Sequence, residues 1–219
     1  EKVSTPWRAP GLHNLRTICF GTTCDTLFVG VEGSSSNVST VFLLRSDGFV
    51  RHKTYAPRSG SNASILNPVD GELFINDYYK GMVLRWDRDK QEMVELVQCF
   101  NNSTDFTYCW SHDGKYLYAL ALGGASHSAI VRMEYDFTTK TLGEPNTWVG
   151  MDGQLGYQDG VGEDARINQP YQMCTGLQGD FFLADTWNHC IRRIVDNAGT
   201  ATVTTYAGVG GQLGFTEGD

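Results

Sequence analysis

Two segments of the chain repeat the same strand-turn-strand pattern, and this repeat constrains the fold more than any other feature. Residues 71–86 (GELFINDYYKGMVLRW) and 179–194 (GDFFLADTWNHCIRRI) align without gaps. A second pair, residues 150–160 (GMDGQLGYQDG) and 208–218 (GVGGQLGFTEG), shares 6 of 11 residues. Repeats of this length are typical of folds in which one small structural unit is built several times and stacked on itself.

Four short apolar runs mark the same strand in successive units. They begin at Leu27, Leu73, Leu117 and Phe181. After a turn or loop, each is followed by a strand that contains an arginine, then by a polar hairpin and a further strand. Short strands separated by Gly and Asn/Asp turns, with no helical periodicity, predict antiparallel blades.

The expected fold is therefore all-β: a β-propeller of four-stranded antiparallel blades. About four blades fit in the chain, at residues 11–57, 58–98, 103–149 and 165–208, and both ends fall in the middle of a repeat. The net charge of −8 argues against nucleic acid as a partner, because phosphate binding needs a basic face. No apolar run approaches the ~18 residues that a membrane-spanning helix requires.

Three of the six cysteines occupy one equivalent position on the expected innermost strand. They are Cys19, Cys109 and Cys174, and Ile65 takes this position in the remaining blade. A small apolar residue packed between blades explains the pattern, so we expect buried free thiols. The alternative is a disulfide within the remaining three, Cys24, Cys99 and Cys190, whereas the spacings fit no zinc site.

Residues 165–208 resemble an NHL repeat. The run ARINQPYQMCTGLQGDFFLADTWNHCIRRIV closes with VTTYAG, and its strand ending in Ala-Asp is followed by the Asn188-His189 turn of the NHL signature. Cys190 and Ile191 depart from the usual leucine-containing continuation. The preceding segment, GQLGYQDGVGEDARINQP, resembles the long inter-blade loop of bacterial extracytoplasmic NHL propellers.

This resemblance implies more than the residues themselves show. NHL propellers usually close with six blades, so about two blades are expected outside these residues. Several exported bacterial members have an immunoglobulin-like IPT/TIG domain before the propeller, which makes an additional N-terminal domain an expectation here. The resemblance also implies an extracytoplasmic protein, secreted or at the bacterial cell envelope.

Two aspartates end equivalent strands just before a tight turn. Asp77 and Asp185 are expected to accept hydrogen bonds from backbone N–H groups of that turn. A metal held across the central channel is the alternative, although Val31 and Ala121 stand at or near this place in the other two blades. The acidic run at residues 159–164 does not fit a calcium loop and is interpreted as a turn-rich linker, with an irregular cation site as the alternative.

An arginine recurs once in each blade, followed closely by an aspartate. The arginines are Arg45, Arg85, Arg132 and Arg193, and the aspartates are Asp47, Asp87, Asp136 and Asp196. Repetition in every blade favours local salt bridges within the outer hairpin, worth at most ~1 kcal/mol each if exposed. His189 belongs to the repeat and is expected to form a hydrogen bond within its blade.

No catalytic, metal-binding or cofactor-binding set is recognisable. The remaining histidines, His13, His52, His112 and His127, share no spacing. No G-x-S-x-G motif is present, and the Gly-rich GMDGQLG segment lacks the Lys-Ser/Thr of a phosphate-binding loop. We therefore predict no catalytic residue, no metal and no cofactor.

One group of residues points to a ligand. Tyr79 and Trp187 align in the turn after the second strand, with Tyr78 beside the former, and the nearby inter-blade loop supplies further polar and aromatic residues, namely Arg166, Asn168, Gln169 and Tyr171. Aromatic planes flanked by Asn, Gln and Arg suit sugar rings. The alternative is that these aromatics pack onto neighbouring loops.

The function expected from the sequence is that of an extracytoplasmic binding or scaffold module, which recognises a glycan or protein partner through one propeller face. The alternative is a carbohydrate-active hydrolase or lyase with its site at the channel mouth, because propellers serve both roles. Carboxylates and histidines that converge at the channel would favour the enzyme. A channel lined by Cys, Met and small residues would favour the binding module.

Overall fold

The structure is a computed structural model. It describes residues 63–90, 92–101, 106–122 and 128–214, together with Asp105 and the backbone of the strands between residues 15 and 55. Except for two single-turn 3-10 helices, the regular elements in these ranges are β-strands. No helix in the described part of the chain is long and apolar enough to cross a membrane.

The strands form four antiparallel sheets that follow one another in chain order. The first blade contains β1 (Leu15–Phe20), β2 (Thr26–Val31), β3 (Ser39–Arg45) and β4 (Gly48–Tyr55). The second blade contains β5 (Ser64–Leu66), β6 (Leu73–Asp77), β7 (Met82–Asp87) and β8 (Glu92–Gln98). In both, each strand is hydrogen-bonded to the next.

The third and fourth blades each have a fifth strand segment. The third contains β9 (Asp105–Trp110), β10 (Tyr116–Leu122), β11 (Ala129–Asp136), β12 (Thr141–Leu142) and β13 (Asn146–Gly150), and both β12 and β13 pair with β11. Pro145 lies in the gap between these two segments and has no N–H for the ladder, which explains the interruption of the outermost strand. The fourth contains β15 (Gln172–Thr175), β16 (Phe181–Asp185), β17 (Cys190–Asn197) and β18 (Thr200–Ala207), with β14 (Gly160–Val161) added beside β18.

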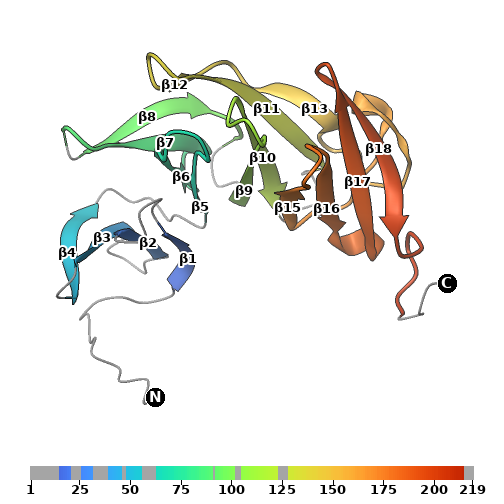
Figure 1. The fold of residues 1–219 in the computed structure, drawn as a ribbon. Helices are drawn as coiled ribbons and strands as arrows, with labels where there is room; N and C mark the ends of the chain where they lie inside the picture. Colours follow the sequence, from blue (N-terminus) through green and yellow to red (C-terminus); the bar gives the residue numbers. More distant parts are fainter. Residues whose placement is uncertain are drawn as a thin grey trace.

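The four sheets fan out in an arc (Figure 1), with β1, β5, β9 and β15 on the concave side and the outer strands on the convex side. Neighbouring innermost strands contact one another from β1 to β15. The predicted all-β propeller is therefore confirmed, with two five-stranded sheets in place of the expected four-stranded ones.

The strand register confirms the equivalence of the inner-strand positions. Cys19 pairs with Phe28, Ile65 with Phe74, Cys109 with Tyr118 and Cys174 with Phe182. The four described thiols, Cys99, Cys109, Cys174 and Cys190, are all free, which excludes a disulfide between Cys99 and Cys190. Cys24 lies outside the described residues.

The prediction of burial holds for only one of the two equivalent thiols that can be compared. Cys109 is 5% exposed between the third and fourth blades, where its Sγ lies 3.5 Å from Thr175 Oγ1. Cys174 is exposed. It lies on the last blade of the arc, where no further blade in the described residues covers its strand.

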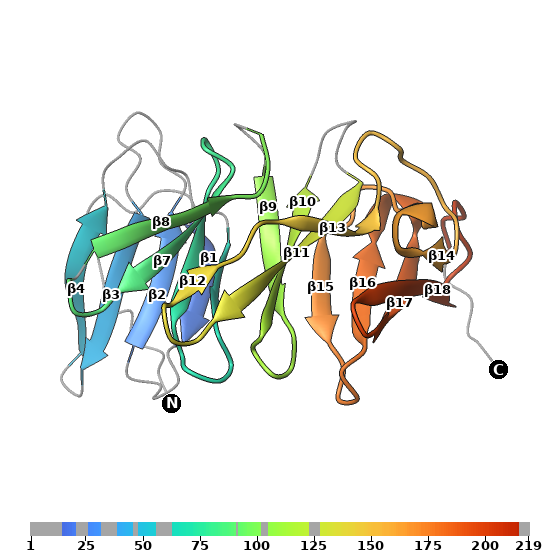
Figure 2. The same ribbon diagram turned by 90° about the horizontal axis from the view of Figure 1, so that it is seen from above.

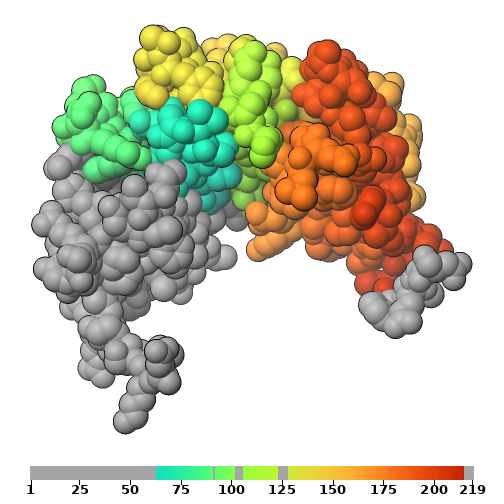
Figure 3. Space-filling model, viewed as in Figure 1, coloured from blue at the N-terminus to red at the C-terminus, as the bar shows by residue number. Residues whose placement is uncertain are grey.

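Aromatic and aliphatic side chains fill the spaces between blades. Between the second and third blades, the Phe74 ring contacts Trp110 and Tyr135 edge-on, at 5.0 Å and 5.5 Å between ring centroids. Between the third and fourth, Tyr118 packs against Trp148 and Phe181. These side chains are almost completely buried, so the second, third and fourth blades form one continuous packed body (Figure 3).

In the second, third and fourth blades, the aspartate of the outer hairpin accepts hydrogen bonds from backbone N–H groups of its turn. Asp87 Oδ1 accepts the N–H groups of Asp89 and Lys90, at 3.1 and 3.0 Å. Asp136 and Asp196 have the same role in the third and fourth blades, in the turns that follow β11 and β17. This arrangement is an Asx turn, in which the carboxylate replaces a backbone acceptor.

The expected local arginine–aspartate pairs form in one blade only. Arg85 lies 3.7 Å from Asp87 and 3.1 Å from Glu72. Arg132 instead pairs with Asp196 of the following blade, at 3.4 Å. Arg193 pairs at 2.7 Å with Asp180, which immediately precedes the neighbouring strand β16. The prediction was wrong for the latter two because their guanidinium groups reach across a strand or a blade boundary, while their own hairpin aspartate is used by the turn. The side chain of Arg45 lies outside the described residues.

Candidate functional site

The β13–β15 connection and the β6–β7 and β16–β17 turns lie on one edge of the arc, which we call the loop face. Figure 2 shows the β13–β15 connection at the upper edge, whereas the β9–β10 and β15–β16 turns lie at the lower edge. Because strands alternate in direction within a blade, the β6–β7 and β16–β17 turns share the upper edge. Both aromatic turn residues predicted from the sequence, Tyr79 and Trp187, belong to these turns.

The predicted aromatic residues are substantially solvent-exposed. Trp187 is 62%, Tyr171 64% and Tyr79 45% exposed. Tyr78 is half-buried and contacts the Tyr79 ring edge-on, with centroids 5.1 Å apart. The alternative, in which these rings pack onto neighbouring loops, therefore applies to Tyr78 more than to the others.

Hydrogen bonds bring part of the predicted group together in the fourth blade. The Trp187 N–H donates to Asn168 O at 3.2 Å, and the Tyr171 N–H donates to Ala184 O at 3.1 Å. We call Asn168, Gln169, Tyr171 and Trp187 the fourth-blade rim. Gln169 adopts a left-handed conformation (φ 44°), which marks a tight bend between Asn168 and Tyr171.

Two other predicted groups are separate from this rim. Tyr78 and Tyr79 belong to the second blade, and the third blade stands between them and Trp187. Arg166 lies in the same loop as the rim, but its guanidinium binds that loop. It donates to the carbonyls of Glu163 and Ala165 and, at 2.9 Å, to Gln154 Oε1. Arg166 thus stabilises the loop that presents the rim.

A buried ion pair fixes the backbone beneath the rim. Arg192 and Asp185 are both 0% exposed, and Arg192 Nη1 lies 2.9 Å from Asp185 Oδ2. Arg192 also donates to the carbonyls of Arg166 and Gln158, at 3.1 and 3.0 Å, and to Asp159 Oδ1 at 2.6 Å. One side chain therefore joins β17 to both ends of the loop.

Asp185 does not have the predicted role. Its Oδ1 accepts the N–H of Asn168 at 2.8 Å, from the inter-blade loop, and its Oδ2 accepts Asn188 Nδ2 at 2.8 Å. No backbone N–H of its own turn binds the carboxylate. Burial raises the pKa of Asp185, against the opposing effect of these hydrogen bonds and of Arg192. The prediction is confirmed for Asp77, whose Oδ1 accepts the Lys80 N–H at 3.1 Å.

Asp159 completes this network at the protein surface. Burial alone would raise its pKa, but hydrogen bonds from Thr205 and the charge of Arg192 outweigh burial and lower it. The rest of this acidic run forms β14 and a 3-10 turn (Gly162–Asp164).

Arg192 was missed by the sequence reasoning, which considered only the neighbouring Arg193. The sequence did contain a sign of this residue. Arg192 is a second arginine in the same strand as Arg193, at the position that Val131 occupies in the third blade.

The concave side of the arc has a shallow channel surface. A cavity of about 330 Å³ is lined by the innermost strands, including Ile65, Cys109, Met173, Cys174 and Thr175. His112 also borders it. No carboxylate lines this cavity in the described residues, and these residues contain no group of three metal-binding side chains.

His189 is exposed on the β16–β17 turn. Its backbone N–H, rather than its side chain, forms the hydrogen bond within the blade, to Thr186 O.

Solved structures resemble this arc, although no protein-family model and no curated protein matches the chain significantly. An auxiliary nutrient-binding protein from Bacteroides thetaiotaomicron is 27% identical, with a TM-score of 0.75, and is matched over 90% of this chain and 48% of its own. An auxiliary nutrient-binding protein from Bacteroides ovatus is 23% identical, with a TM-score of 0.74, over 92% and 49% of the two chains.

The periplasmic gluconolactonase PpgL of Pseudomonas aeruginosa shares the fold at 16% identity, with a TM-score of 0.59. It is matched over 90% of this chain and 54% of its own. The chain thus spans about half the length of the structures it matches. Because propellers with binding and with enzymatic roles are both among them, the fold by itself allows either function.

Proposed function

We propose that the protein is a binding module that recognises a glycan or protein partner through its loop face, at the fourth-blade rim. The observation that supports this most is the exposed indole of Trp187. Its turn is anchored by the Asn168 carbonyl and by the buried Asp185–Arg192 pair. A large aromatic side chain has only two rotatable χ angles, so it loses little conformational entropy when a partner packs on it.

Three further observations support a binding module. Tyr171 adds a second exposed ring close in the chain to amide side chains that can bind sugar hydroxyls or peptide groups. The described lining of the channel surface includes Cys109, Met173 and Cys174 and a single histidine, His112, rather than the converging carboxylates and histidines that would favour the enzyme. The nutrient-binding protein from Bacteroides thetaiotaomicron is similar to 90% of this chain, at 27% identity.

The proposal also covers the type of propeller and the location of the protein in the cell. The Asn188-His189 turn supports an NHL-type propeller that closes with further blades beyond the four described here. The periplasmic and nutrient-binding proteins of the same fold support an extracytoplasmic location. The hydrolase or lyase alternative shares this location, and would place its reaction at the channel surface rather than at the rim.

The test is the removal of the indole. A glycan array with the unmodified protein identifies a ligand, and calorimetry then compares its affinity for the protein with Trp187→Ala and Tyr171→Ala. We expect Trp187→Ala to weaken binding by at least about 2 kcal/mol, as for an aromatic residue at the centre of an interface.

Phe137→Ala is the matched control, because Phe137 is an exposed aromatic residue (37%) in the β11–β12 hairpin, away from the loop face. This variant should bind like the unmodified protein. Unchanged affinity in both rim variants, with the fold preserved by circular dichroism, would refute the proposed site.

A further inference from the structure

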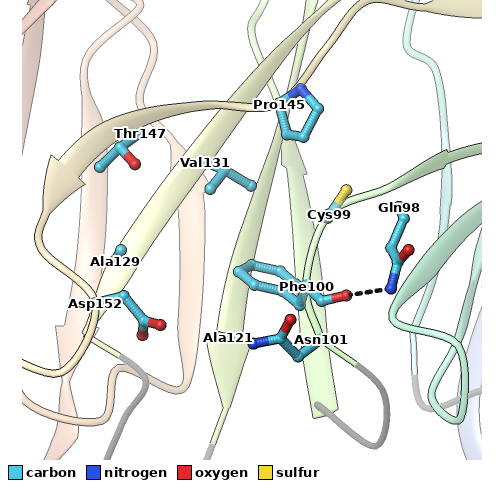
Figure 4. Close-up of a pocket in the computed structure, with 10 residues that line it drawn as sticks. All are labelled: Gln98, Cys99, Phe100, Asn101, Ala121, Ala129, Val131, Pro145, Thr147 and Asp152. Atoms are coloured by element: carbon cyan, nitrogen blue, oxygen red, sulfur yellow. Dashed lines mark hydrogen bonds between the residues drawn. The ribbon is translucent and has the colours of Figure 1, made fainter.

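A second hollow lies between the second and third blades. It is a cavity of about 430 Å³. Its floor is formed by small apolar residues of β10 and β11, namely Ala121, Ala129 and Val131 (Figure 4). One wall is the segment after β8, residues 98–101, and the other includes Thr147 of β13 and Asp152. Its volume lies within the roughly 300–1,000 Å³ that is usual for small-molecule sites.

Comparison of the blades explains why this space is open. In the third blade Ala119 pairs with Val131, and in the fourth the equivalent Leu183 pairs with Arg192. By the same register Ala121 corresponds to Asp185. The fourth blade thus has a buried ion pair, covered by a long loop, where the third blade has an alanine and a valine.

The connections that lead into the third and fourth blades differ in length. The connection between β8 and β9 runs from Gln98 to Asp105, whereas the connection between β13 and β15 runs from Gly150 to Gln172. The longer connection supplies the carbonyls that Arg192 binds. The described residues of the shorter one, 99–101, form one wall of the cavity, at the place that the fourth blade fills with its ion pair and loop.

Both walls are held by backbone contacts. The N–H groups of Cys99 and Phe100 donate to Gly81 O, at 2.9 and 3.2 Å. Gly81 has φ +62°, and a Cβ there would lie 2.3 Å from Phe100 O, so only glycine permits this close approach. On the other side, Ser128 Oγ donates to Met151 O at 2.6 Å. The cavity is therefore preformed.

The polar groups at its edge are neutral, with one exception. They are the amides of Gln98 and Asn101, the hydroxyl of Thr147 and the carboxylate of Asp152. No lysine, arginine or histidine is among the described residues that line the cavity. An anionic ligand would therefore meet no countercharge from these residues, in a protein whose net charge is −8.

We propose that this cavity binds one or two units of a neutral saccharide. The apolar floor, with the Phe100 side of the wall, faces the CH groups of the sugar ring, and the amides, hydroxyl and carboxylate pair with its hydroxyls. None of the lining residues belongs to the fourth-blade rim. This site therefore does not depend on the role proposed for Trp187.

The experiment is saturation-transfer NMR followed by calorimetry on the whole protein. The probes are maltose, cellobiose and N-acetylglucosamine at millimolar concentration, with glucuronate as the anionic comparison. We expect at least one neutral probe to bind and glucuronate to bind more weakly. Ala129→Leu, which extends a side chain into the cavity, should abolish this binding. Asp152→Asn should weaken it about tenfold, as expected when a charged hydrogen-bond acceptor is lost.

Matched controls separate the two proposed sites. Asp89→Asn, an equally exposed carboxylate in the β7–β8 hairpin, and Trp187→Ala should both bind the probe like the unmodified protein. If Ala129→Leu fails to fold, the comparison of Asp152→Asn with Asp89→Asn decides. The proposal is overturned if no neutral probe binds, if glucuronate binds best, or if binding depends on Trp187 and not on Asp152.

Discussion

At the scale of single residues, Arg192 organises the fourth blade. It is completely buried, and its five contacts join Asp185, Asp159, the Gln158 and Arg166 carbonyls and, over the ring face, Tyr157. A buried arginine is tolerated only where charge and hydrogen bonds compensate for lost hydration. The loop that presents the rim therefore depends on this one side chain.

Removal of this arginine should be costly. Arg192→Met leaves Asp185 buried without its countercharge, and we expect the free energy of unfolding to fall by about 3–5 kcal/mol. Arg193→Met, one residue along the chain, is the control. The Arg193 side chain is 41% exposed, whereas its partner Asp180 is 11% exposed. Because solvent screens this pair more than the fully buried one, Arg193→Met should cost less, about 1–2 kcal/mol.

Urea unfolding followed by fluorescence measures both variants. The double variant Asp185→Ala with Arg192→Val, which copies the third blade, should recover part of the loss because no unpaired charge remains. Equal effects of Arg192→Met and Arg193→Met would show that the buried network contributes little.

Thiol reactivity should differ between the two equivalent inner-strand cysteines. Burial raises the pKa of Cys109 to about 11, so its thiol stays protonated at neutral pH, and the thiolate is the reactive form. Cys174 is exposed. We expect iodoacetamide to modify Cys174 in the folded protein, and Cys109 only after unfolding, as measured by peptide mass mapping. Equal labelling rates for the two would contradict the packing between the third and fourth blades.

At the scale of elements, the outer hairpins of the second, third and fourth blades share one device. In each, an aspartate that is the last or second-last residue of the third strand accepts backbone N–H groups of the turn. The N–H groups of Thr139 and Thr138 lower the pKa of Asp136, and those of Lys90 and Asp89 contribute in the same direction at Asp87. A carboxyl group with a lowered pKa in the folded state stabilises the protein only while it is ionised.

Stability should therefore fall in acid. The contribution of Asp136 is fully present above its unfolded-state pKa, near 3.8, and is lost as the pH falls through the lower folded-state value. Asp136→Asn keeps an acceptor for the turn but does not titrate. The urea midpoint of this variant should decline less between neutral pH and pH values below about 3 than that of the unmodified protein. An identical decline would exclude a contribution of this turn.

The equivalence of strand positions was predictable from the sequence, whereas contacts between elements were not. The repeated apolar runs sufficed to place Cys109 and Cys174 at the same position of their blades, because these patterns are local. The Arg132–Asp196 pair joins two blades, and nothing in either hairpin specifies the partner. The role of Asp185 depends on a loop that returns from the previous blade.

Only part of the candidate site could be predicted from the sequence. Trp187 and Tyr171 are exposed as ligand-binding aromatics should be, and the usual connectivity of propeller strands indicated their shared edge. Arg166 was expected at the rim as a ligand group, but its guanidinium is used by its own loop. The cavity above Ala121 was not predicted, because it follows from the short connection before the third blade rather than from any motif.

At the scale of the whole molecule, three parts of the described surface differ in the residues that they present. The concave side presents inner strands with Cys, Met and Thr, the convex side presents hairpins closed by aspartates, and the loop face presents aromatic rings and the open cavity. A rigid arc of short loops suits recognition, because binding requires little reorganisation of the backbone. The central claim is that ligands bind at the loop face.

Hydrogen–deuterium exchange with the strongest ligand from the glycan array tests that claim most directly. We predict slower exchange on binding at residues 166–171 and 186–189, with no change at the opposite edge, in the turns around residues 111–115 and 176–180. Protection confined to that opposite edge, or to the inner strands of the channel surface, would contradict the account.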